Sequence, residues 1–104
     1  MTALPVACCL SADELAERER EIRALFADSL RGSRRQPNRL DLGFADGSSQ
    51  RIEALAEAER RCCAFLTFTV TGGAAAPALA IEAPPGAEET LADFAAVARE
   101  ALPR

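Results

Sequence analysis

The sequence predicts an α/β fold, a two-layer sandwich in which helices cover one face of a four-stranded sheet. Its 104 residues match the usual size of one domain with one hydrophobic core, so residues 1–104 are expected to form a single domain. Three segments have apolar residues at helical spacing, and the segments between them alternate apolar with polar residues. The expected order is β-α-β-α-β-β-α, which two layers accommodate economically.

The first predicted elements are a strand over residues 2–10 and a helix that follows it. Pro5 places this strand at a sheet edge or marks its start. Ser11 to Glu14 forms a capping box that opens the helix, and Gly32 ends it. The apolar stripe of this helix consists of Leu15, Ile22, Leu25, Phe26 and Leu30. Such a helix is amphipathic and is expected to pack on the sheet.

The middle of the chain predicts a loop, a strand and a second helix. Residues 31–38 are polar and contain a proline, so a loop is expected there. Residues 39–44 alternate in the manner of a half-buried strand. Residues 45–49 supply a turn and a helix cap, and the helix runs from Gln50 to about Cys63. Its inward residues are expected to include Ile52 and Leu55.

The last third of the chain predicts two strands and a third helix. Residues 65–71 alternate Phe and Leu with Thr, and Gly72 with Gly73 marks a turn before a strand over residues 78–83. Residues 84–86 break the chain before a helix over residues 88–102. The inward stripe of this helix consists of Leu91, Phe94, Ala95, Ala98 and Leu102.

Composition excludes several classes of function. All 12 basic residues are arginines and the net charge is −4, which disfavours nucleic acid as the main partner. The four arginines between residues 31 and 39 are interpreted as a solvated loop. Because the chain has no His, it lacks the usual general base and every His-based zinc site. No signal peptide or membrane span is predicted, so a cytoplasmic protein is expected.

Four cysteines form two adjacent pairs at element boundaries. Cys8 and Cys9 lie where the first predicted strand leads into a helix, and Cys62 and Cys63 lie where the second helix leads into a strand. The pairs are therefore expected to meet at one end of the sheet. Buried packing as small apolar residues is the alternative. Adjacent Cα atoms are about 3.8 Å apart, below the ~4.4 Å that a disulfide needs, whereas a bridge from Cys8 to Cys62 stays open.

The spacing of the thiols favours a soft metal ion. Structural zinc sites separate paired cysteines by two to four residues, which adjacent pairs do not. Soft ions that accept few sulfur ligands suit such pairs, so Hg(II) is expected first, with Cu(I) or As(III) as alternatives and no organic cofactor. Glu59 precedes Cys62 by three residues and Cys63 by four, so it is expected on the same helix face as a weak ligand or proton donor. The alternative is a solvent-facing Glu59.

Two motifs resemble a group of small bacterial proteins associated with mercury-type heavy-metal resistance genes. Residues 7–10 fit its A-C-x-L opening and residues 59–65 fit its E-R-x-C-C-x-F centre, within a resemblance that spans nearly the whole chain. The resemblance implies that Cys8, Cys62, Cys63 and Glu59 are the site positions. Cys9 stands where that group has Thr or another small residue, and Ala64 stands where Pro is frequent.

Three functions are consistent with these residues. The first is a mercury-binding protein, monomer or homodimer, that sequesters Hg(II) or transfers it to a partner protein. The second is an enzyme that cleaves the carbon–metal bond of an organomercurial, with two thiolates on the metal and Glu59 as the catalytic proton donor. The third is a thiol-redox or arsenical-responsive interaction module, which would act through a partner protein.

Overall fold

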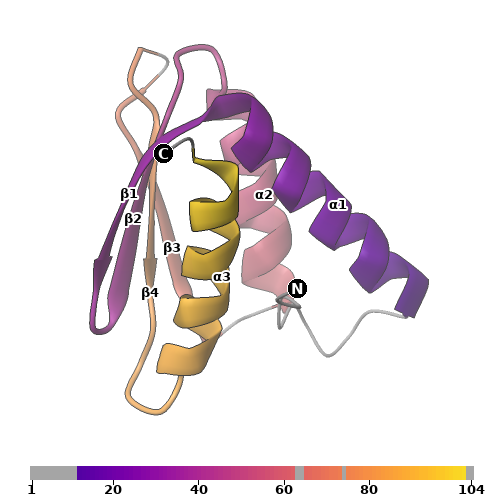
Figure 1. Cartoon of the computed structure of the whole chain (residues 1–104), viewed down its shortest axis with the longest axis vertical. Helices are drawn as coiled ribbons and strands as arrows, with labels where there is room; N and C mark the ends of the chain where they lie inside the picture. Colours follow the sequence, from indigo (N-terminus) through magenta and orange to yellow (C-terminus); the bar gives the residue numbers. More distant parts are fainter. Residues whose placement is uncertain (1–11, 63–64, 74, 103–104) are drawn as a thin grey trace.

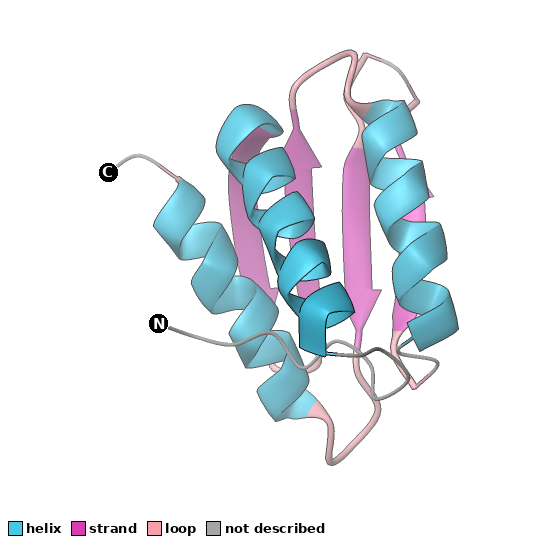
Figure 2. Cartoon of the chain, turned by 90° about the vertical axis from the view of Figure 1, so that its right-hand side faces the viewer, coloured by secondary structure: helices cyan, strands magenta, loops and turns pink. Residues whose placement is uncertain are grey.

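The computed structural model describes residues 12–62, 65–73 and 75–102. Three helices lie together on one face of a four-stranded antiparallel sheet, as Figures 1 and 2 show from two sides. The described elements, in chain order, are α1 (Ala12–Ser29), β1 (Leu30–Gln36), β2 (Arg39–Phe44), α2 (Ser49–Cys62), β3 (Thr67–Thr71), β4 (Ala78–Glu82) and α3 (Glu88–Ala101). The predicted two-layer sandwich, with its four strands and helices on one face, is confirmed.

The sheet consists of two hairpins placed side by side. Its strand order is β1-β2-β4-β3, so each outer strand pairs with its hairpin partner and the inner strands β2 and β4 pair with each other. Leu40 of β2 lies opposite Ile81 of β4, which in turn lies opposite Phe68 of β3. The apolar side chains of three strands are thereby aligned under the helices.

The order of elements differs from the prediction at the start of the chain. The strand predicted over residues 2–10 lies outside the described residues, and the described chain begins with α1. The loop predicted over residues 31–38 is wrong, because most of it forms β1, paired with β2 from Leu30 opposite Phe44 to Gln36 opposite Arg39. Most β1 side chains are exposed at a sheet edge, so the segment lacks apolar alternation. The helix also ends at Ser29 instead of reaching Gly32.

The core lies between the sheet and the three helices. Most of the predicted inward helix residues belong to it, together with the inward side chains of the strands, while Leu55 and Leu102 are partly buried against it. Two aromatic pairs tie the layers together: the Phe26 and Phe44 rings have centroids 5.8 Å apart, and the Phe68 and Phe94 rings 6.4 Å apart. No described helix is long and apolar enough to cross a membrane.

A serine at the start of α2 sets the phase of that helix. The carbonyl oxygen of Ser48 accepts a hydrogen bond from the backbone N–H of Ile52 at 3.0 Å, so Ser48 is the N-cap residue immediately before α2. Its hydroxyl donates to the carbonyl of Ala45 at 2.6 Å and fixes the preceding turn. Ile52, Ala56 and Glu59 then occur at helical spacing on one face, and all three are fully buried.

Candidate functional site

The structure describes only part of the predicted cysteine site. Cys8, Cys9 and Cys63 lie outside the described residues. Cys62 is the last residue of α2, and its side chain also lies outside the description. The predicted meeting of the two cysteine pairs therefore stays a prediction. Glu59, the remaining predicted residue, is described in full.

Glu59 is buried in the interface between α2 and the rest of the molecule. Its exposed fraction is 0%, and it is the one charged side chain among the described residues that is buried. The inward position predicted from helix phase is confirmed, and the solvent-facing alternative is wrong. A carboxylate without water loses several kcal/mol of solvation and needs a compensating charge or a proton.

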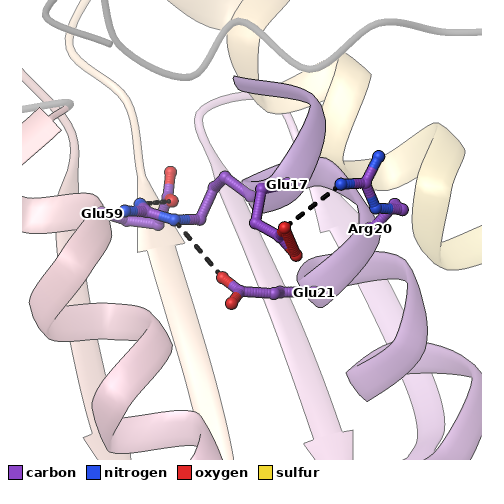
Figure 3. Close-up of polar contacts among 5 residues, drawn as sticks. Glu17, Arg20, Glu21 and Glu59 are labelled. Atoms are coloured by element: carbon purple, nitrogen blue, oxygen red, sulfur yellow. Dashed lines mark hydrogen bonds and ion pairs between the residues drawn. The ribbon is translucent and has the colours of Figure 1, made fainter. Parts of the chain in front are cut away.

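Arg18 of α1 supplies that compensating charge. Its Nη1 atom donates to Oε2 of Glu59 at 2.7 Å, a short charge-assisted hydrogen bond. The Arg18 side chain is itself only 19% exposed, and its Nε atom lies 3.8 Å from Oε1 of Glu21. Figure 3 shows Glu59 facing this contact from α2, with Glu21 and Glu17 on the facing helix. The guanidinium thus lies between a buried carboxylate and an exposed one.

Arg18 is the site residue that the sequence analysis missed. The two partners are 41 residues apart, and pairing over that distance follows from tertiary structure alone. The chain nevertheless contained a signal, because Arg18 precedes Ile22 by four residues and Leu25 by seven. It therefore interrupts the apolar stripe of α1, as Glu59 interrupts that of α2. A positive residue in the apolar stripe of one helix and a negative residue in that of another are consistent with a buried ion pair, as Arg18 and Glu59 form here.

Burial and pairing act on the proton affinity of Glu59 in opposite directions. Desolvation raises the pKa of Glu59 because it disfavours the charged carboxylate, and this is the larger effect. The hydrogen bond and positive charge of Arg18 lower it in part, and the net pKa is raised. A carboxyl group of this kind can hold or release a proton in a site from which water is excluded.

The described residues place Glu59 beside the start of the cysteine pair. Helical geometry puts the backbone of Cys62 about 4.5 Å further along the α2 axis than that of Glu59. Within the described part of the chain, no three acidic or cysteine residues converge to hold a metal ion. Among the described residues, the carboxylate of Glu59 is bonded to Arg18.

The end of α2 is fastened to the neighbouring edge strand. Arg60, the residue after Glu59, donates from Nη2 to the backbone carbonyl of Phe68 in β3 at 2.8 Å. Phe65, which precedes β3, is 49% exposed and is an unusual apolar surface residue for this chain. The hydrogen bond from Arg60 thus joins the last turn of α2 to β3.

Comparison with known proteins adds no homologue to this description. No family model matches the chain, and no curated protein or solved structure is detectably similar to it. The function of the site therefore follows from the chemistry of its residues.

Proposed function

We propose that this protein binds a soft, thiophilic metal ion, with Hg(II) as the first candidate, through Cys8, Cys62 and Cys63, with Cys9 as an additional thiol. It would act in the cytoplasm, either sequestering the ion or transferring it to a partner protein. The observation that carries the proposal is the buried ion pair of Glu59 with Arg18, one helical turn before Cys62. The resemblance of residues 7–10 and 59–65 to mercury-associated bacterial proteins supports it.

The buried pair supports a functional site because a buried ion pair adds little net stability to a core. Two apolar side chains of similar volume often stabilise a core as well as, or better than, a buried ion pair. A buried carboxyl is instead useful where a proton must be held or released beside thiols, since the thiolate is the metal ligand. Ionisable groups with shifted proton affinity concentrate at functional sites for this reason.

Native mass spectrometry with Hg(II), Cu(I), Zn(II) and As(III) offered together tests the proposal. The expected result is a stoichiometric Hg(II) complex that survives excess monothiol. The Cys62→Ala/Cys63→Ala double variant is expected to lose the complex, while the matched Cys9→Ala variant keeps it. Equal Hg(II) binding by the double variant and the wild type contradicts the proposal.

Cleavage of organomercurials is a second candidate, favoured by the raised pKa of Glu59. Two thiolates would hold the mercury, and the protonated carboxyl would transfer its proton to the carbon as the carbon–mercury bond breaks. The products are a hydrocarbon, a bis-thiolate mercury complex and a carboxylate that Arg18 stabilises. Gas chromatography of the released hydrocarbon checks this step. Glu59→Gln should abolish release and keep Hg(II) binding, whereas release by Glu59→Gln excludes this role for the carboxyl.

A further inference from the structure

The β1–β2 hairpin carries an excess of positive charge. Residues 30–44 contain four arginines and one aspartate, a formal charge of +3, whereas the whole chain carries −4 and the remainder therefore −7. Arg39 of β2 is already paired, because its Nε atom lies 3.0 Å from Oδ1 of Asp41 and its Nη1 atom lies 3.6 Å from Oε2 of Glu82. The other three arginines are exposed on β1 and form no ion pair with any described residue. They are Arg31, Arg34 and Arg35.

The strand that bears these arginines is an outer strand of the sheet. Among the described strands, β1 has β2 as its one neighbour. The backbone N–H of Phe44 in β2 donates to the carbonyl of Pro77, just before β4, at 3.0 Å, so Phe44 faces away from β1. Successive residues of a strand direct their backbone groups to opposite sides, so Asp41, three residues earlier, faces β1.

The same alternation identifies the open backbone groups of β1. Arg34 lies opposite Asp41 and therefore directs its N–H and C=O groups toward β2. Ser33 and Arg35, its neighbours, direct theirs to the outer side, where no described strand receives them. On the other outer strand, β3, a guanidinium from α2 already occupies one backbone carbonyl. The edge at β1 thus combines open pairing groups with unpaired positive charge.

We infer that β1 binds an extended acidic segment of a partner protein, which joins the sheet as a further strand. Main-chain hydrogen bonds at Ser33 and Arg35 would hold the segment, and its carboxylates would face the exposed arginines. Binding at this edge would not require the cysteines, so it is independent of the proposed metal function.

The charge of β1 disfavours two other occupants. Antiparallel pairing of β1 with a second copy of itself about Ser33 would bring Arg31 opposite Arg35, and like charges in that position are destabilising. Nucleic acid would meet no aromatic residue among the arginines of residues 31–39 and would be repelled by the negative charge of the rest of the chain. An acidic polypeptide strand meets neither obstacle.

Fluorescence anisotropy with synthetic peptides and the intact protein tests this inference. The probe is a labelled peptide of alternating glutamate and valine with the length of β1, 7 residues. One matched peptide replaces glutamate with lysine, and another keeps the glutamates but is N-methylated at alternate residues on its pairing edge. The acidic peptide is expected to bind about tenfold more tightly than either. Equal affinity for the N-methylated peptide overturns strand pairing, and equal affinity for the lysine peptide overturns selection by charge.

Two variants of the protein locate the peptide on β1. Ser33→Pro removes an outward N–H group and leaves the bonds to β2 intact, a substitution that edge strands tolerate, and should weaken binding about tenfold. Val70→Pro is the matched control on the other edge, because Val70 follows Phe68 by two residues and Arg60 reaches the outward carbonyl of Phe68. Equal affinities of these two variants contradict binding at β1.

Charge reversal provides an independent test that leaves the backbone unchanged. Arg34→Glu should weaken binding of the acidic peptide about tenfold, whereas Arg20→Glu, on an exposed position of α1, makes the same change in net charge and should leave it unaltered. Equal losses in the two variants overturn the inference. So does tighter binding of single-stranded oligothymidylate than of the peptide, which would indicate nucleic acid, or a dimer in sedimentation velocity that Ser33→Pro dissociates, which would indicate a second copy.

Discussion

Arg18 and Glu59 join the first two helices through a 2.7 Å ion pair whose carboxylate is completely removed from solvent. Removing one partner of such a pair leaves the other charge uncompensated, which is far more costly than losing an exposed pair. Arg18→Ala is expected to lower the free energy of unfolding by about 3 kcal/mol at neutral pH. Urea unfolding followed by circular dichroism measures this loss.

Two controls make that loss specific to burial. Arg51→Ala removes the exposed pair with Asp28 and should change stability by less than about 0.5 kcal/mol. The Arg18→Met/Glu59→Leu double variant removes both charges and should be about as stable as the wild type. Equal destabilisation by Arg18→Ala and Arg51→Ala would falsify the energetic importance of burial.

The stability of the protein should depend on the protonation of Glu59. Because the pKa of Glu59 is raised in the folded chain, the folded state binds more protons than the unfolded state between the two pKa values. The stabilisation linked to this proton is complete below the unfolded-state pKa and is lost as the pH rises through the folded-state pKa. Glu59→Gln removes the effect.

A difference between two variants isolates the contribution of the Glu59 carboxyl to stability. The free energy of unfolding of the wild type minus that of Glu59→Gln is expected to fall with rising pH across this window. Denaturant unfolding at a series of pH values measures it. A difference that stays constant or rises with pH contradicts the raised pKa.

Arg60 is expected to protect the edge of the sheet. β3 is an outer strand, and the Arg60 guanidinium occupies the carbonyl of Phe68 that would otherwise be open to another chain. Arg60→Ala should cost about 1 kcal/mol of stability and increase self-association. Arg61→Ala is the matched control on the next, exposed position. Sedimentation velocity at increasing concentration measures association, and identical profiles for the two variants contradict the role of Arg60.

The turn after β3 contains two glycines that differ in their tolerance of a side chain. Both have positive φ, +86° at Gly72 and +60° at Gly73. A Cβ atom on Gly72 would lie 1.8 Å from the carbonyl oxygen of Ala76, whereas one on Gly73 meets nothing within 4 Å. Gly72→Ala is therefore expected to cost about 3 kcal/mol and Gly73→Ala about 1 kcal/mol. Thermal unfolding measures both, and equal losses contradict the difference in space.

Periodicity predicted the helices well because each covers the sheet with an apolar stripe. Ile22, Leu25 and Phe26 of α1, and Leu91 and Phe94 of α3, are buried as the spacing predicts. β1 escaped prediction because an edge strand can expose most of its side chains and still satisfy its backbone through β2. Its stability comes from pairing, which residue patterns report only indirectly.

The sequence also predicts only part of the candidate site. The burial of Glu59 follows from helix phase within α2, a local property that the sequence determines. Its pairing with Arg18 depends on how α1 and α2 pack. This is a tertiary relation between segments about 40 residues apart, and the sequence shows it only as charged residues within apolar stripes.

The pairing of β2 with β4 joins two halves of the chain. One half is α1 with the β1–β2 hairpin, and the other is α2, the β3–β4 hairpin and α3. The first half has one helix on its hairpin and the second has two, and each half alone is too short to bury a full core, so neither is expected to persist in isolation. Folding then requires the halves to meet, which makes the barrier depend on contacts distant in sequence. A chain cut between Phe44 and Ser49 should regain its fold only when both fragments are mixed.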